Sequence, residues 1–239
     1  MLLEISKSIG QIVADDYRAA VTFKKYGIDF CCGGNVTVAA AASKKGIDTT
    51  SLFAELADAA ASKEDNISFS EYSPGELAEY IVNTHHKYVL EAIPLLKAYA
   101  EKVCRVHGDN HPPLLTIRQL AETAFKELEM HLQKEEMILF PYLRLLSKAQ
   151  TENKTVVPPP FGTVANPICM MEYEHEIAGE IFKQIRVLTN DYTPPEWACN
   201  TFKAYYDKLE EFEDDLHIHV HLENNVLFPK AIQLEQSYA

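Results

Sequence analysis

The amino-acid sequence predicts an all-α protein in which a four-helix bundle follows a small N-terminal helical domain. Three observations support this fold class. Apolar residues recur at helical spacing in four long segments of the second part of the chain. Shorter helical patterns that end at glycines occupy the first part. The signature His-x3-Glu-x3-Leu-Phe-Pro also occurs twice in helical sequence, at residues 131–141 and 219–229.

Length and composition restrict the class of protein. The 239 residues are enough for one large or two small domains, and an apolar content of 47% is enough for a core. A net charge of −13 makes nucleic acid an unfavourable partner. No apolar run reaches the length of a membrane helix and no signal-peptide pattern is found, so we expect a cytoplasmic protein with no membrane partner. Five cysteines in a chain of this length indicate reduced thiols.

Residues 1–62 are expected to form the small helical domain. Two helical patterns precede Gly27, which marks a stop. A turn-rich loop at 28–35 leads into a short helix that Gly46 would cap. A further helix is expected over residues 51–61.

A polar stretch without periodicity, 62–73, predicts a linker to the second domain, which we expect over residues 74–236. The four helices predicted there cover residues 74–104, 113–149, 164–190 and 194–233. Internal prolines should kink or end these helices locally, and they are Pro94, Pro141 and Pro229.

The repeated signature predicts a metal site. A four-residue step places a histidine and a glutamate above one another on one helix face, where both can bind the same ion. Each copy also has a single histidine upstream at nearly the same distance. The six candidate ligands are His86, His131, Glu135, His175, His219 and Glu223. They share helix faces with apolar residues and are expected to point inward, where an unpaired carboxylate would cost several kcal/mol.

Four imidazoles and two carboxylates suit two iron ions in a helix bundle, with manganese or zinc as alternatives. A carboxylate from each of two opposite helices can bridge the ions, and the count of ligands leaves coordination positions open for water or a small gas. A histidine alone on an apolar face is usually an ordinary core residue, but six positions in duplicated spacing argue against that interpretation here.

The remaining histidines are weaker candidates. Three adjoin candidate ligands but lie off their helix face, and they are expected at the surface or behind the ligands: His85, His217 and His221. The phase of the helix favours His86 over the adjacent His85 as the ligand. His107 and His111 fall in a loop and are expected to be exposed to solvent.

The loop with Cys31 and Cys32 is a second candidate for chemistry, and we consider both residues as catalytic. A thiolate can be stabilised ahead of a helix start, and the following glycines allow close approach of a partner. Adjacent cysteines rarely form a relaxed disulfide with each other. The alternative is that they are ordinary small residues of the interior. The remaining cysteines are scattered and expected to be structural: Cys104, Cys169 and Cys199.

Together these segments resemble the RIC (repair of iron centres) family of di-iron proteins, over nearly the whole chain. The matching segments are 26–34 with its Cys-Cys-Gly-Gly, 131–141, 171–175 and 219–229. The resemblance implies a hemerythrin-like four-helix bundle holding two iron ions. It also implies that the four candidate histidines are terminal iron ligands, and that Glu135 and Glu223 bridge the two ions.

The resemblance further implies repair of iron-sulfur clusters damaged by nitric oxide or peroxide, with damaged iron-sulfur proteins as clients and iron released from the di-iron site. Gly179 and Asn224 stand where oxygen-carrying hemerythrins have a further His and Asp ligand. Fewer imidazoles imply a more labile site. The Cys31–Cys32 loop would take part in iron release or nitrosyl chemistry.

Two alternative functions stay open on the sequence. One is an enzyme, a di-iron nitric oxide reductase that converts NO to N2O. The other is a sensor or carrier of O2 or NO, which would leave the Cys-Cys-Gly-Gly loop without a role. The sequence also leaves open whether the chain forms a homodimer and how the N-terminal domain docks.

Overall fold

The computed structural model describes residues 7–62 and 67–238. These residues form helices joined by turns, and the only extended pairing among them is an isolated bridge between Ser8 and Thr37. The predicted all-α class is confirmed. The chain divides into two compact units. We call residues 1–79, 142–166 and 217–239 the first unit, and residues 80–141 and 167–216 the second unit.

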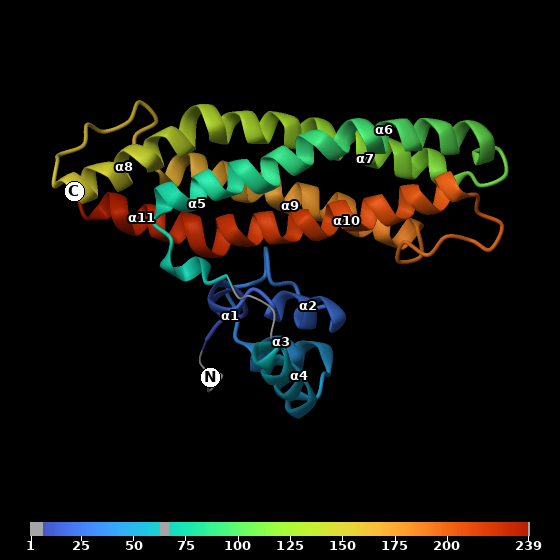
Figure 1. Ribbon diagram of the computed structural model, residues 1–239, viewed down its shortest axis with the longest axis horizontal. Helices are drawn as coiled ribbons and strands as arrows, with labels where there is room; N and C mark the ends of the chain where they lie inside the picture. Colours follow the sequence, from blue (N-terminus) through green and yellow to red (C-terminus); the bar gives the residue numbers. More distant parts are fainter. Residues whose placement is uncertain (1–6, 63–66, 239) are drawn as a thin grey trace. The chain divides into compact units, whose positions relative to one another are not determined.

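The second unit is a four-helix bundle (Figure 1). Its long helices are α6 (Lys87–His107), α7 (Pro113–Lys134), and most of α9 (Ala165–Leu188) and of α10 (Asn200–Leu222). The two units divide α10, because its residues 217–222 belong to the first unit. Three buried phenylalanines join three of them in the core. The ring centroid of Phe212 in α10 lies 5.3 Å from that of Phe125 in α7 and 5.6 Å from that of Phe182 in α9. These separations are those of well-packed aromatic pairs.

Three π-helical turns interrupt the long helices. They are η2 (Val82–His86), which follows α5 (Pro74–Ile81), η3 (Glu135–Leu139) and η4 (Glu223–Leu227). After η3 and η4 the chain continues as α8 (Phe140–Glu152) and α11 (Phe228–Gln236). Each signature copy therefore has its Glu at the start of a π turn and its Phe-Pro at the start of the next helix.

The π turns explain how the helices continue past two of the prolines. A proline lacks the N–H that would bond the carbonyl four residues back, and its ring crowds that carbonyl. In η3 the N–H of Phe140, just before Pro141, instead bonds the carbonyl of Glu135, five residues back, and in η4 Phe228 bonds Glu223 in the same way. The local interruption predicted at these prolines is confirmed. Pro94, by contrast, lies inside α6, which continues on both sides of it.

The first unit contains the short N-terminal helices. They are α1 (Ile9–Asp15), α2 (Ala19–Lys25), α3 (Val38–Lys45) and α4 (Thr49–Ala61), followed by the 3-10 helix η1 (Phe69–Glu71). Ser8 caps α1 by accepting from the N–H of Gln11, and Asp48 caps α4. Gly46 ends α3 with a φ of +67°, a conformation that glycine adopts without strain, as predicted.

Helices α8 and α11 complete the first unit, and hydrogen bonds tie them to other parts of it. The Tyr238 hydroxyl donates to the Leu146 carbonyl at 3.3 Å, and the N–H of Val164 donates to the Glu235 carboxylate at 3.0 Å. The Lys230 ammonium donates to the Ser70 carbonyl at 2.7 Å. Helix α1 packs against turn η4.

Two predictions about connecting segments were wrong. The predicted linker includes η1, whose Phe69 is buried, while residues 63–66 of it lie outside the described range. Helix α10 starts at Asn200 and not at 194, because the N–H of Ala198 closes a separate turn on the carbonyl of Pro195. The domain boundaries 1–62 and 74–236 stay predictions. In the described ranges, no helix combines the length and apolar character needed to cross a bilayer.

Candidate metal centre

Four of the six candidate ligands belong to the second unit, and all four are buried. They are His86 at the end of η2, His131 in α7, Glu135 at the start of η3 and His175 in α9. None is more than 2% exposed. A buried carboxylate at 0% exposure requires a cation or strong hydrogen-bond donors, because its desolvation costs several kcal/mol.

The donor atoms of these residues converge on Glu135. One oxygen of Glu135 lies 3.4 Å from Nε2 of His86 and 3.4 Å from Nε2 of His131. The Nε2 atoms of His131 and His175 lie 3.1 Å apart. Two ring nitrogens at this distance share either a proton or a cation. Two nitrogens bound at right angles to one metal ion would lie about 3 Å apart.

Carboxylates hold the opposite ring nitrogen of two of these histidines. Nδ1 of His86 lies 2.8 Å from Glu136 and Nδ1 of His131 lies 2.9 Å from Glu174. Such a contact fixes the ring orientation and leaves Nε2 available to a metal. The hydrogen bond with His131 lowers the pKa of Glu174 to about 2. Partial burial opposes this shift, and the hydrogen bond with Lys134 adds to it. Glu174 is therefore an anion at neutral pH.

The first unit holds the other two candidates. His219 lies in α10 and Glu223 begins η4, and they are 1% and 0% exposed. Nε2 of His219 lies 3.1 Å from the Glu223 carboxylate. The second copy of the signature therefore repeats the His-Glu arrangement of the first copy, as the four-residue step predicts.

The donor set fits a metal ion of the first transition series. In the second unit, atoms of His131, Glu135 and His175 all lie within 4.8 Å of one another. Atoms of His86 and Glu135 also lie within 4.8 Å of each other. The same holds for His219 and Glu223 in the first unit. Imidazole and carboxylate together suit iron, manganese and zinc. The histidine and glutamate clusters could thus hold metal.

The π turn corrects the expectation for His85. This residue is 4% exposed, and its Nδ1 lies 2.9 Å from Asp215 of the acidic run in α10. The wider turn η2 brings both adjacent histidines inward, His86 toward Glu135 and His85 toward Asp215. His85 is therefore buried and not at the surface, whereas its place behind a ligand stays a prediction.

Other histidines are also more enclosed than predicted. His107 and His111 are half-buried, and their rings lie against Trp197 and Phe202 at centroid distances of 5.6–6.0 Å. The expectation of exposed loop residues was therefore wrong, because aromatic side chains from a distant part of the sequence cover them. His221 is 1% exposed, and burial lowers its pKa to about 4.

The two adjacent cysteines differ from each other. Cys31 is buried and Cys32 is exposed, and their sulfur atoms lie 3.9 Å apart. Asp29 accepts hydrogen bonds from both backbone N–H groups at 3.0 Å and from the Cys31 thiol at 3.2 Å. Burial alone would raise the pKa of Asp29, but its bonds from Gly33 and from both cysteines lower it.

The buried cysteine is held as a neutral thiol. The contact with Cys32, burial, and the charge of Asp29 all raise the pKa of Cys31 well above its usual value. Cys32 is therefore the accessible thiol of the loop. Of the three other cysteines, Cys104 is buried, while Cys169 and Cys199 are exposed.

Sequence reasoning missed three residues that support the candidate site. Glu136 and Glu174 hold imidazoles, and Asn225 donates its amide to backbone carbonyls of the cysteine loop. The carboxylates had no signal in the sequence, because each reaches a histidine on another helix. Asn225 could have been noticed from the difference between the signature copies, since Met137 stands at the matching position of the first copy.

Comparisons with known proteins agree with this arrangement. The family described as "Hemerythrin HHE cation binding domain" matches residues 77–231, and a domain of unknown function, DUF542, matches residues 5–60. The chain is 36% identical to the iron-sulfur cluster repair protein YtfE of Dickeya chrysanthemi, over 96% of this chain and 98% of the relative. It is also 36% identical to YtfE of Pectobacterium atrosepticum, over the same shares.

A third relative is the probable iron-sulfur cluster repair protein of Haemophilus influenzae, which is 38% identical over 90% of this chain and 91% of the relative. The two matched domains occur in the order that the resemblance to the RIC family implied, a Cys-Cys-Gly-Gly segment before a cation-binding bundle. The chain belongs to the family of iron-sulfur cluster repair proteins that carry a hemerythrin-type cation-binding domain.

Proposed function

We propose that this protein repairs damaged iron-sulfur clusters by donating iron from a centre of two iron ions. The single observation that carries the proposal is the burial of six histidines and glutamates from a duplicated signature, none of them more than 2% exposed. The names of the relatives supply the reaction class. The clients would be iron-sulfur proteins, and the site of action the cytoplasm.

The ligand assignment follows the two signature copies. His86, His131, His175 and His219 would be terminal ligands, and Glu135 and Glu223 would bridge the two ions. Iron bound in this way would supply exchangeable metal with coordination positions open to small molecules such as NO and O2. The chain's own contribution is to orient the imidazoles through carboxylates such as Glu174.

The difference between the two cysteines gives them different proposed roles. Cys32 is exposed and would be the thiol that meets departing iron or a client. Cys31 is buried beside Asp29 and would shape the loop as a neutral thiol. Replacing both cysteines by alanine should leave the iron content intact and slow iron transfer.

The test is an iron-transfer experiment. Protein purified without oxygen is expected to contain near two irons per chain, and this iron should appear in a cluster when an apo iron-sulfur acceptor is added. The acceptor's absorbance and the iron content of both proteins after separation measure the transfer. Two irons that stay bound while the acceptor remains empty would refute donation and favour gas chemistry at a fixed site.

A further inference from the structure

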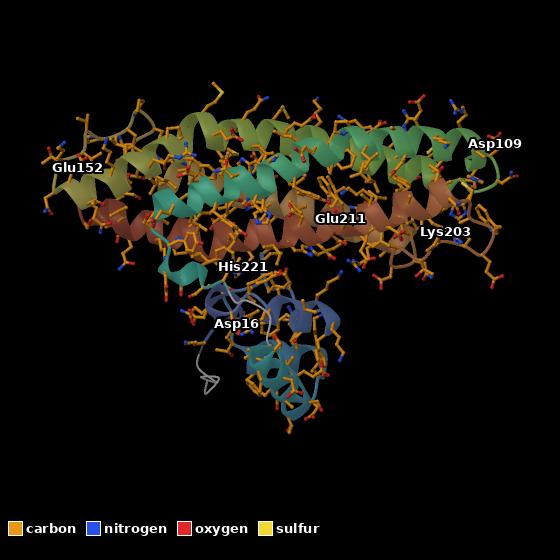
Figure 2. All side chains as sticks on the ribbon, viewed as in Figure 1. Asp16, Asp109, Glu152, Lys203, Glu211 and His221 are labelled. Atoms are coloured by element: carbon orange, nitrogen blue, oxygen red, sulfur yellow. The ribbon has the colours of Figure 1, made fainter. Side chains whose placement is uncertain are left out.

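The cysteine loop is fastened to the second signature copy by one amide side chain. Nδ2 of Asn225 donates to the carbonyl of Cys31 at 2.8 Å and to that of Phe30 at 3.3 Å. His221, labelled in Figure 2, lies 3.2 Å from the Phe30 carbonyl through Nδ1. Because a carbonyl only accepts, Nδ1 of His221 is the donor in this contact. Two side chains of the signature region thus bind consecutive carbonyls of the loop.

Two glycines make room for the Asn225 side chain. A Cβ atom on Gly10 would lie 2.5 Å from the Asn225 side-chain oxygen, and one on Gly34 would lie 2.6 Å from the same atom. The N–H of Gly10 also bonds the carbonyl of Gly34 at 2.7 Å. The amide therefore fits into a slot between α1 and the loop. This fit gives Gly34 of the Cys-Cys-Gly-Gly motif a packing role.

Asn225 also shares its backbone turn with a candidate metal ligand. The π turn η4 covers five residues and contains both Glu223 and Asn225. Glu223 is fully buried, whereas Asn225 faces the cysteine loop. A change in the turn's backbone that releases one of these side chains would also move the other, since only one residue separates them.

We propose that Asn225 is a positioning residue that fastens the Cys31–Cys32 loop to turn η4, and that the turn links the state of the loop to metal retention by Glu223. The fastening follows from the contacts alone, whereas the link to metal rests on the proposed function. A docked loop keeps Cys31 buried and the turn fixed. A released loop exposes Cys31 and loosens the hold of Glu223 on its ion, and the coupling is reciprocal.

The experiment compares three variants of the iron-loaded protein. Asn225→Ala removes the amide, and Asn225→Asp keeps its shape but replaces the donor by an acceptor. Met137→Ala is the matched control, because Met137 occupies the same position of the first copy and is 77% exposed. Alkylation of Cys31 by iodoacetamide, located by peptide mass spectrometry, measures how often the loop is released and Cys31 exposed. The rate of iron loss to a ferrous chelator measures how firmly Glu223 retains its ion.

Both Asn225 variants should alkylate Cys31 about tenfold faster than the wild type, because the hydrogen-bond donor that binds the loop carbonyls is lost. They should also lose iron faster, while Met137→Ala changes neither rate. Unchanged alkylation of Cys31 in both variants, with intact helical circular dichroism, would overturn the fastening. Fast alkylation with iron loss at the wild-type rate would overturn the link. A wild type that binds no iron would refute the proposed function and the link, and the alkylation rates would still decide the fastening.

Discussion

The two copies of the signature have the same inner face and different outer faces. In both copies the His and Glu are buried, the Glu begins a π turn, and the helix resumes at Phe-Pro. The outward positions differ. Ile138 is 48% exposed in the first copy, whereas the matching Val226 of the second copy is 3% exposed. Met137 is exposed, and the matching Asn225 is half-buried against the cysteine loop.

This difference separates two kinds of information in one motif. The inner positions satisfy requirements that arise inside the helix, namely the four-residue step and the π turn before proline. The exposure of the outer positions depends on which other segments pack over each copy. In the second copy α1 and the loop supply that cover. The same local sequence rule therefore yields a buried His-Glu pair in both copies, and an outer face covered by α1 and the loop in the second copy.

Loss of either inner glutamate should have the largest effect, and it should be the same in both copies. We expect Glu135→Leu and Glu223→Leu each to lose at least one iron per chain, because the proposed assignment makes each glutamate a bridging carboxylate. The apo fold should persist, since an apolar residue at a buried position leaves no unpaired charge. Metal analysis and far-ultraviolet circular dichroism measure both effects. Two irons retained in both variants would contradict the bridging assignment.

Loss of a carboxylate behind a ligand should have the next largest effect. Glu174→Gln keeps an acceptor near Nδ1 of His131 but removes the charge. We expect iron affinity to fall about 10- to 100-fold, the usual effect of such outer contacts. Competition with a chelator measures it. Glu180→Gln, on the same helix with a 65% exposed side chain, should leave affinity unchanged, and an equal loss there would point to general charge effects.

The covered face of the second copy should contribute more to stability than the open face of the first. Val226→Ala should lower the free energy of unfolding by about 1–2 kcal/mol, since it removes buried methyl groups. Ile138→Ala should change it by about 0.5 kcal/mol or less. Urea denaturation of the metal-free protein measures both. Equal losses would mean that α1 and the loop do not stabilise the second copy.

Local patterns in the sequence predicted much of this molecule. The four long helices were found because apolar periodicity is local, and the six buried candidate ligands because their spacing is repeated. The burial of Phe69 was missed, because it arises from tertiary packing. The contact of His221 with Phe30 was missed for the same reason, since 191 residues separate the two. The prolines signalled an interruption, but a π turn was not distinguishable from a kink.

The smallest effect expected concerns the loop that the second copy binds through Asn225. The raised pKa of Cys31 means that the docked loop is stable below the usual thiol pKa and loses stability as pH rises through the raised one. Asp29→Asn keeps an acceptor for the N–H groups of the cysteines but removes a negative charge, so the pKa of Cys31 should fall. Alkylation of Cys31 at pH 8 should rise a few-fold, and its pH profile should shift to lower pH.

Asp58→Asn makes the same charge change at an exposed position of α4 and should leave the profile in place. A profile unmoved by Asp29→Asn would show that Cys32 and burial alone hold Cys31 neutral. A shift accompanied by faster iron loss would instead connect Asp29, through the loop and Asn225, to the ligand turn of the second copy. The first copy, whose Met137 is exposed to solvent, offers the internal standard for both outcomes.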